Sequence, residues 1–497
     1  MWLRWALAAT LAVAAVAVAA IALVTDDTST APPTPGFPNI PEGRKPVIFD
    51  VGLIAGSNPK EALRQAHDLG ADAIRVLVPW NIVAPPDPSN DFRASDPDDP
   101  DYNFDYYDTA LAQIHQLGMR ALFAPTGPAP GWAAKPVEPA GVVDPDPREF
   151  GKFVSALAKR YSGHFVPAGE TGPVQKVDLW TVWNEPNLST FLQPQYRDGR
   201  PFSPLMYRKL YLAAQTAIHE QQPDAPILIG ETAPTGGEQS VDPLTFTRQT
   251  LCVNGDYQDL AHCPSPDESI DAIGWSAHPY PLVGEAPFEP VTNPHFVTMS
   301  SLSALESTLD GASGADKLPS DFPIYITEFG VQSFPDPNAV SLNDQAAFIA
   351  IAEHFAYQDP RVATFAQYLL NDDSPAAIPG QSYGGFESGL RLYDGTEKPA
   401  YSAFRLPLAV QRLGDGVSLW GLVQPYPHPT TVKIRYRNPG QPPRDLQTAD
   451  TDPVGVYTTN YGDFPDRRWQ VVWRSPDDGN TYRTPWIRSY EFAAPTP

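Results

Sequence analysis

The chain has 497 residues, more than the roughly 250 to 300 at which single hydrophobic cores stop growing, so we expect a large domain and a smaller one. Its 34 Lys and Arg residues against 58 Asp and Glu residues give a net charge of −24, which argues against nucleic acids and anionic lipid headgroups as partners. A hydrophobic content of 42% with 11% aromatic residues excludes a mainly disordered chain. The aromatic residues suit either a packed core or a site for neutral ligands with apolar faces.

An uncharged, almost wholly apolar run occupies residues 6–24, with Arg4 before it and Asp26 and Asp27 after it. Its length suits a helix across the hydrocarbon core, and the positive flank predicts that the rest of the chain lies outside the cytoplasm. We assign residues 1–24 to a signal anchor or a signal peptide. The anchor is favoured, because the run exceeds the usual hydrophobic region of a signal peptide and no small-residue cleavage pattern follows it.

Residues 25–45 are rich in Pro and Thr and poor in apolar residues, which is the composition of an extended linker. The expected location is therefore extracytoplasmic, with the protein either anchored to the membrane by its N-terminal helix or secreted.

Between residues 46 and 405, short apolar segments alternate with amphipathic helical ones, the pattern of βα units around a parallel sheet. The predicted strands are 46–54, 73–79, 120–125, 177–183, 226–230, 270–277, 323–328 and 362–370. The predicted helices are 59–70, 105–118, 147–161, 204–221, 242–251, 298–310, 341–357 and 399–405. Eight strand–helix pairs predict an α/β fold of the (β/α)8 TIM barrel type. The alternative, a doubly wound open sheet, would normally carry a glycine-rich phosphate turn after an early strand, and the sequence has none there.

Residues 406–497 have a different texture, with short alternating segments separated by Pro, Gly, Asn and Asp, which predicts a small β-sandwich. Its three tryptophans, Trp420, Trp469 and Trp473, could bind carbohydrate or pack inside the scaffold. Packing is favoured, because each alternates with apolar residues inside a predicted strand.

Cys252 and Cys263 are the two cysteines of the chain, and they flank a turn-prone stretch. Two thiols without histidines at ligand spacing do not make a zinc site, which leaves a local disulfide or a pair of free thiols. Export to an oxidising compartment favours the disulfide.

Two glutamates follow barrel strands directly, where the catalytic groups of such barrels lie. Glu185 comes after the fourth predicted strand and Glu328 after the seventh. A single glutamate in this position is commonly a surface or salt-bridging group, but two facing carboxylates across a barrel mouth are what cleavage of a glycosidic bond requires. Glu231, after the fifth strand, is a third such carboxylate, which could bind substrate hydroxyls or cap its loop.

The sequence Asn-Glu-Pro at 184–186 and Thr-Glu-Phe-Gly at 327–330 resembles the retaining glycoside hydrolases of clan GH-A, over about residues 46–405. The resemblance implies that Glu185 is the acid/base, that Glu328 is the nucleophile and that Asn184 binds the sugar 2-hydroxyl. Within the clan, the loop containing Trp132, the His-Pro-Tyr segment and the trailing sandwich look most like family 39 and its actinobacterial cellulase-like relatives, with family 5 next.

The same resemblance implies roles for five more residues. Arg75 matches the strand-two arginine that holds the nucleophile ionised, and His278 and Tyr280 match the strand-six pair whose phenol hydrogen-bonds the nucleophile. Trp80 and Trp132 match aromatic platforms for sugar rings, although each could equally be packing.

The eighth strand departs from the clan, which usually has a Trp there. The chain offers Gln367, Tyr368, Asn371 and Asp372 instead, so the floor of the subsite is not specified by the sequence.

No metal or organic cofactor is expected, since the mechanism needs water and two carboxylates and the nine histidines show no ligand spacing. The acidic loop 91–102 could hold a structural calcium ion or could be a solvated surface loop, and the solvated loop is favoured. The expected partner is a polysaccharide or oligosaccharide substrate, with no nucleic acid, and a monomer is expected. Two alternatives remain open: a non-catalytic glycan-binding surface protein, and a transglycosylase or furanosidase of the same fold.

Overall fold

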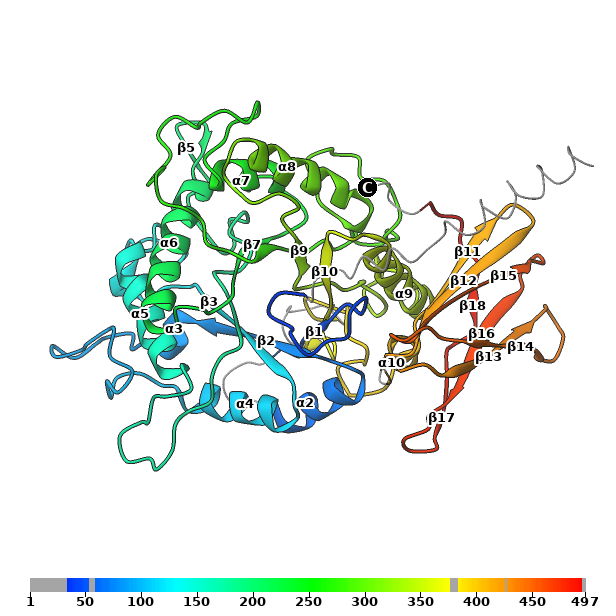
Figure 1. The fold of residues 1–497 in the computed structure, drawn as a ribbon. Helices are drawn as coiled ribbons and strands as arrows, with labels where there is room; N and C mark the ends of the chain where they lie inside the picture. Colours follow the sequence, from blue (N-terminus) through cyan, green and yellow to red (C-terminus); the bar gives the residue numbers. More distant parts are fainter. Residues whose placement is uncertain (1–33, 53–58, 376–382, 425, 427, 494–497) are drawn as a thin grey trace, which may run out of the picture. The chain divides into compact units, whose positions relative to one another are not determined.

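The computed structural model describes residues 34–52, 59–375, 383–424, 426 and 428–493. Within them, eight parallel strands close into a barrel in the order β1-β10-β9-β8-β7-β4-β3-β2 (Figure 1). The strands are β1 (Val47–Asp50), β2 (Ala73–Pro79), β3 (Arg120–Thr126), β4 (Leu179–Thr181), β7 (Ile227–Thr232), β8 (Gly274–Ala277), β9 (Ile324–Ile326) and β10 (Val362–Tyr368). Each lies where the sequence pattern predicts a strand, so the predicted TIM barrel is confirmed.

The predicted helices also form, and they lie around the barrel (Figure 1). They are α2 (Pro59–Asp68), α4 (Asp105–Gln116), α5 (Pro147–Arg160), α6 (Ser203–Gln221), α7 (Pro243–Thr250), α8 (Leu302–Gly314), α9 (Leu342–Gln358) and α10 (Pro399–Arg405). In α5, the Asp146 side chain caps the first turn, Pro147 occupies its first position, and Phe150 and Phe153 point into the core. This combination of cap and apolar stripe makes the segment helical.

The predicted helix 298–310 opens with a 3-10 turn, Met299–Ser301, directly before α8. Three short features are not predicted by the sequence pattern: α3 (Trp80–Val83), the 3-10 turn Gly131–Ala133, and a hairpin of β5 (Tyr196–Arg197) and β6 (Arg200–Pro201). Each is too short for its hydrophobic periodicity to show.

The C-terminal residues form two antiparallel sheets, which confirms the predicted sandwich. One sheet has the order β11-β12-β15, and the other has β14-β13-β16-β17 with β18 paired to β16. Their strands are β11 (Leu408–Leu413), β12 (Gly416–Leu422), β13 (Thr431–Arg437), β14 (Arg444–Asp450), β15 (Val456–Gly462), β16 (Arg468–Arg474), β17 (Thr481–Arg483) and β18 (Ile487–Arg488). The nearly fully exposed β14 was not predicted, because it carries no alternating apolar pattern.

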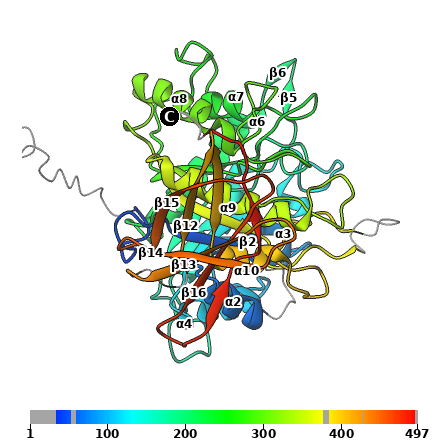
Figure 2. The ribbon, with the colours of Figure 1, turned by 90° about the vertical axis from the view of Figure 1, so that its right-hand side faces the viewer.

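The tryptophans of the C-terminal strands are packed inside the protein. Trp469 and Trp473 are 0% and 2% exposed, and Trp420 is 5% exposed. The Trp420 ring lies 4.9 Å from His354 and 5.5 Å from Tyr357, both on α9. The packing interpretation is therefore confirmed, and the sheets lie beside α9 and α10 (Figures 1 and 2).

The second half of the predicted linker belongs to the folded barrel. Phe37 is fully buried, and the Tyr325 hydroxyl donates to the Pro35 carbonyl at 2.9 Å. Arg44 forms an ion pair with Asp72 at 2.8 Å. An extended spacer would leave these groups in water. The predicted linker 25–45 is therefore corrected, since its residues 34–45 pack against the barrel.

The predicted membrane segment lies outside the described residues. In the part of the chain that the structure describes, no helix has both the length and the apolar character needed to cross a membrane. Cys252 and Cys263 form a disulfide with Cα atoms 5.5 Å apart, which confirms their predicted pairing.

A buried carboxyl group lies between the barrel and the C-terminal sheets. Glu353, on α9, is fully buried and accepts hydrogen bonds from Gln424 Nε2 at 2.9 and 3.0 Å. Burial raises the pKa of Glu353 to about 8, although the charge of Arg44 and the Gln424 hydrogen bond act in the opposite direction.

We expect Glu353→Gln to raise the free energy of unfolding at pH 8 by on the order of 2 kcal/mol and to leave it nearly unchanged at pH 4.5. The folded wild type keeps this proton up to about pH 8, whereas the unfolded chain loses it above about pH 4.5, so wild-type stability falls as the pH rises between these values. Glutamine does not ionise, and its amide can donate to Gln424 Oε1, which has no donor among the described groups. Urea unfolding at both pH values measures the difference, and an equal gain at both would contradict the expectation.

Candidate active site

Glu185 and Glu328 follow the carboxyl ends of β4 and β9, at the mouth of the barrel. Their side chains are 15% and 8% exposed. One carboxylate oxygen of each lies within 4.8 Å of the other. The closed parallel sheet therefore brings to one place two glutamates that are far apart in the sequence.

Arg75 lies on β2, is fully buried and contacts four polar side chains. Its guanidinium donates to Glu328 Oε1 and to Glu231 Oε2. It also donates to Asp50 Oδ2 at 3.1 Å and to Asn184 Oδ1 at 2.6 Å. A buried guanidinium with these contacts favours the ionised form of the carboxylates around it.

His278 and Tyr280 follow β8 and face the two glutamates. The Tyr280 hydroxyl donates to Glu328 Oε2 at 2.8 Å. His278 Nδ1 lies 3.1 Å from Glu185 Oε1 and 3.5 Å from Glu328 Oε2, and its Nε2 lies 3.3 Å from Glu231 Oε2. Burial lowers the pKa of His278, but the three carboxylates more than offset it and raise the pKa to about 10. The raised pKa favours the protonated ring near neutral pH, in which Nδ1 donates to Glu185 Oε1 and Nε2 faces Glu231 without a hydrogen bond.

Glu231 lies beneath the site, with no exposed surface. Its Oε1 accepts hydrogen bonds from Ser276 at 2.6 Å and Thr327 at 3.0 Å, and its Oε2 faces Arg75 and His278. Burial raises the pKa of Glu231, but the two cations and these hydrogen bonds lower it far below its ordinary value. A buried carboxylate with all its contacts inside the protein does not reach a substrate, so Glu231 supports the charges of the site instead of binding sugar hydroxyls.

Asp50 is a site residue that the sequence analysis missed. It ends β1, is 3% exposed, and contacts Arg75. Burial raises the pKa of Asp50 to about 6; Arg75 lowers it and Glu328 raises it. The signal in the sequence is one acidic residue at the end of an otherwise apolar strand.

The end of β10 carries Tyr368, where the resemblance to clan GH-A leads us to expect a tryptophan. The Tyr368 ring lies 6.3 Å from that of Tyr280. Gln367 is fully buried and donates to two backbone carbonyls. Asp372 pairs with the buried Lys398 at 2.6 Å, and Asn371 is exposed.

Trp80 and Trp132 lie apart from this cluster. Trp80 is fully buried, with its ring stacked 5.7 Å from Phe153 of α5, so neither face is free for a sugar. Trp132 is partly buried, packs edge-on against Trp80 at 5.9 Å, and donates its indole N–H to Pro85. The structure supports the packing interpretation for Trp80.

Metal binding fits this site poorly. Within the described ranges, Glu185, His278 and Glu328 form the one group whose ligand atoms lie close enough together, within 4.8 Å. Both oxygens of Glu328 already accept hydrogen bonds, from Arg75 and Tyr280. The cluster suits proton and charge chemistry better. In the acidic loop, Asp99 accepts backbone N–H groups of its own loop.

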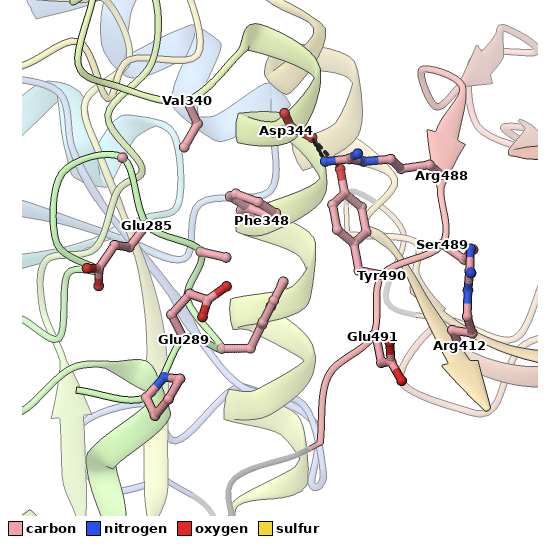
Figure 3. A pocket seen from close by; sticks show the side chains of 14 residues that line it. Glu285, Glu289, Val340, Asp344, Phe348, Arg412, Arg488, Ser489, Tyr490 and Glu491 are labelled. Atoms are coloured by element: carbon pink, nitrogen blue, oxygen red, sulfur yellow. Dashed lines mark hydrogen bonds and ion pairs between the residues drawn. The ribbon is translucent and has the colours of Figure 1, made fainter. Parts of the chain in front are cut away.

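A separate cavity of about 760 Å³ lies between residues 284–290, α9 and residues 488–491 (Figure 3). Its charges are partly paired, because Asp344 accepts from Arg488 at 2.9 Å and from Tyr490 at 2.7 Å. None of its lining residues belongs to the Glu185–Glu328 cluster. This cavity is therefore not part of the candidate active site.

The fold of the chain resembles those of several solved enzymes. A glucosidase from Croceicoccus marinus has a TM-score of 0.52 and 13% identity, over 89% of this chain and 96% of its own. A monomeric β-xylosidase from Caulobacter crescentus CB15 has a TM-score of 0.49 and 14% identity, over 84% and 95%. A family 39 glycoside hydrolase from Bacteroides cellulosilyticus WH2 has a TM-score of 0.48 and 16% identity, over 85% and 82%.

No family model and no curated protein matches the chain. The resemblance to clan GH-A is confirmed at the level of the fold, by the closed barrel and the glucosidase.

Proposed function

We propose that the protein is an exported retaining glycoside hydrolase that cleaves an oligosaccharide or polysaccharide by double displacement. The observation that carries the proposal is the short separation of the Glu185 and Glu328 oxygens, within 4.8 Å. Retaining enzymes place their two carboxyl groups roughly 5 to 5.5 Å apart, whereas inverting enzymes leave roughly 6.5 to 9.5 Å for a water molecule.

The contacts of the two glutamates support different roles for them. Glu328 accepts hydrogen bonds from Arg75 and Tyr280, which keep its carboxylate ionised and aimed, as a nucleophile requires. Glu185 is the more exposed of the two and has no contact with Arg75, which suits a group that exchanges protons with substrate and water. Glu185 and Glu231 both have a positive φ, of 42° and 52°, and such strained residues cluster at functional sites.

The charge balance supports proton uptake by the cluster. When Asp50, Glu185, Glu231 and Glu328 are all ionised, they outnumber the two cations, Arg75 and His278. An excess of buried negative charge favours binding of a proton near neutral pH. This excess is consistent with the raised pKa of Asp50.

The reaction then has two steps. Glu328 attacks the anomeric carbon while Glu185 protonates the leaving oxygen, which yields a covalent glycosyl-enzyme and releases the first product. Glu185, now ionised, removes a proton from water as the water attacks the same carbon, and Glu328 leaves. In this proposal Asn184, whose Oδ1 accepts a hydrogen bond from Arg75, binds the sugar 2-hydroxyl.

Export rests on the N-terminal sequence and the disulfide. The apolar run 6–24 carries the export signal, and a disulfide persists outside the reducing cytoplasm. Whether the run is retained as an anchor is tested by the mass of the mature protein in membrane and culture fractions.

The testing experiment incubates the full chain with a panel of plant and bacterial envelope polysaccharides and follows the products by proton NMR. The proposal expects reducing ends whose first anomeric configuration matches that of the substrate. A first product of opposite configuration would exclude double displacement. Longer glycans formed from added acceptor sugars would indicate a transglycosylase, and binding without any turnover would indicate a glycan-binding protein.

A further inference from the structure

The loops at the barrel mouth expose two phenylalanine rings. Three phenylalanines are exposed among the residues that the structure describes: Phe334, Phe386 and Phe464, at 57%, 43% and 59%. Phe334 follows Glu328 by six residues, and Phe386 lies in the loop after β10. Exposed large apolar side chains grouped near a site mark a binding surface.

Phe386 is linked to the nucleophile candidate by a series of aromatic contacts. Its ring packs edge-on against Tyr368 at 5.2 Å, and Tyr368 packs edge-on against Tyr280 at 6.3 Å. The Tyr280 hydroxyl in turn donates to Glu328. The exposed ring is therefore connected, through Tyr368, to the tyrosine that holds Glu328.

The two exposed rings are carried by loops that are tied to each other. Glu387 N–H donates to Gln332 Oε1 at 2.6 Å, and the Ser333 hydroxyl donates to the Glu387 carbonyl at 3.1 Å. Lys398, only 3% exposed, donates to the same carbonyl at 3.0 Å and pairs with Asp372. Groups fixed before binding lose less conformational entropy when a ligand arrives.

A pocket of about 460 Å³ lies beside Tyr368, within the size range of small-molecule sites. Its lining includes Asp50, Asn371, Asp373 and Tyr393. Carboxylate and amide groups beside aromatic rings match the hydroxyls and the apolar C–H face of a sugar.

We propose that Phe334 and Phe386 form a sugar-binding subsite beyond the ring that is cleaved, so that the substrates are oligosaccharides or polysaccharides and not simple monosaccharide glycosides. The inference rests on the proposed function. It adds the residues that select for the length of the sugar substrate. It also assigns the aromatic platform to the loops after β9 and β10 in place of Trp80.

The kinetic test uses the sugar class that gives turnover in the polysaccharide panel. It compares a nitrophenyl monosaccharide glycoside with oligosaccharides of increasing length, for the wild type and for Phe334→Ala, Phe386→Ala and Phe386→Tyr. Loss of one stacking ring is expected to lower kcat/KM on the longer substrates about tenfold, mainly through KM, and to change it less than about twofold on the monosaccharide glycoside. Phe386→Tyr, which keeps a ring, is expected to restore most of the activity.

Phe464→Ala is the matched control, because Phe464 is equally exposed but lies on the C-terminal sheets, after β15. It is expected to behave like the wild type on every substrate. An equal loss for Phe386→Ala on short and long substrates would show that the ring only supports Tyr368, and no loss at all would likewise overturn the inference.

Binding gives a readout that does not depend on turnover. Calorimetric titration of the same oligosaccharides into Glu328→Gln, with and without Phe386→Ala, is expected to show a Kd about tenfold weaker without the ring, for the longer chains alone. A wild type that binds in this way but cleaves nothing would refute the proposed hydrolysis and keep the subsite. A Phe386→Ala protein with unchanged binding but a smaller mass in solution would show that the rings are an interface between copies of the chain, and would overturn the subsite.

Discussion

Glu328→Gln is expected to fold like the wild type and to lose on the order of 10⁴-fold or more in kcat on every substrate, because an uncharged amide does not attack the anomeric carbon. The substitution keeps the size of the side chain, and the glutamine carbonyl can still accept a hydrogen bond from Arg75 or Tyr280. The measurement is kcat for release of a nitrophenol and of an oligosaccharide, with circular dichroism as the check on folding.

Glu185→Gln provides the contrast that separates the two roles. A general acid contributes typically about 10²- to 10⁴-fold when the leaving oxygen is basic, and almost nothing when the leaving group is an acidic phenol that departs without a proton. We therefore expect Glu185→Gln to lose formation of the glycosyl-enzyme on oligosaccharides but to keep its burst of dinitrophenol from a dinitrophenyl glycoside. A similar burst from Glu328→Gln would contradict the assignment. Glu353→Gln is the control: Glu353 is a buried glutamate on α9, and the variant is expected to keep full activity.

The barrel could be predicted from the sequence because each buried strand is a short, distinct apolar run. The strands of the closed barrel have burial patterns of nearly continuous buried residues, as in β3 (Arg120–Thr126) and β7 (Ile227–Thr232), and helices with apolar stripes separate them. By contrast, β14 (Arg444–Asp450) could not be predicted, since its pairing with β13 depends on backbone hydrogen bonds and its side chains are mostly exposed. Likewise, residues 34–45 have the composition of a linker, yet the buried Phe37, the hydrogen bond to Pro35 and the Arg44–Asp72 ion pair fix them to the barrel.

Some residues of the candidate site could likewise be predicted from the sequence, and others could not. The carboxyl ends of the barrel strands converge on one mouth. Polar residues that directly follow a predicted strand, such as Glu185 and Glu328, can therefore be found from the sequence alone. Trp80 also follows a strand directly, but α3 begins at Trp80 itself and turns the ring back against Phe153. Phe386 lies too far beyond β10 for any periodicity to locate it, and its place depends on the tertiary contacts of Glu387 with its neighbours.

Arg75→Met is expected to destabilise the protein by about 3 to 5 kcal/mol at neutral pH, because it leaves buried carboxylates without their cation. Asp50, Glu231 and Glu328 all contact the Arg75 guanidinium, and Asn184 would lose its donor as well. Without the positive charge, the pKa of Asp50, already raised to about 6 by burial, is expected to move higher. The variant should also lose activity, since a carboxyl group that gains a proton is a poor nucleophile.

The pH dependence of the lost stability distinguishes an electrostatic role of Arg75 from a packing role. A carboxyl whose pKa is raised in the folded state holds its proton there while the unfolded state releases it, so the stability of Arg75→Met should fall as the pH rises above about 4. The difference from the wild type should therefore be smaller at pH 5 than at pH 7.5 in urea unfolding. Arg208→Met is the matched control: Arg208 is 3% exposed but donates to backbone carbonyls, including those of Thr250 and Ser265, so its loss should cost the same at both pH values. An Arg75→Met protein whose deficit is equal at the two pH values, like that of the control, would show that Arg75 acts through packing and not by holding the carboxylates ionised.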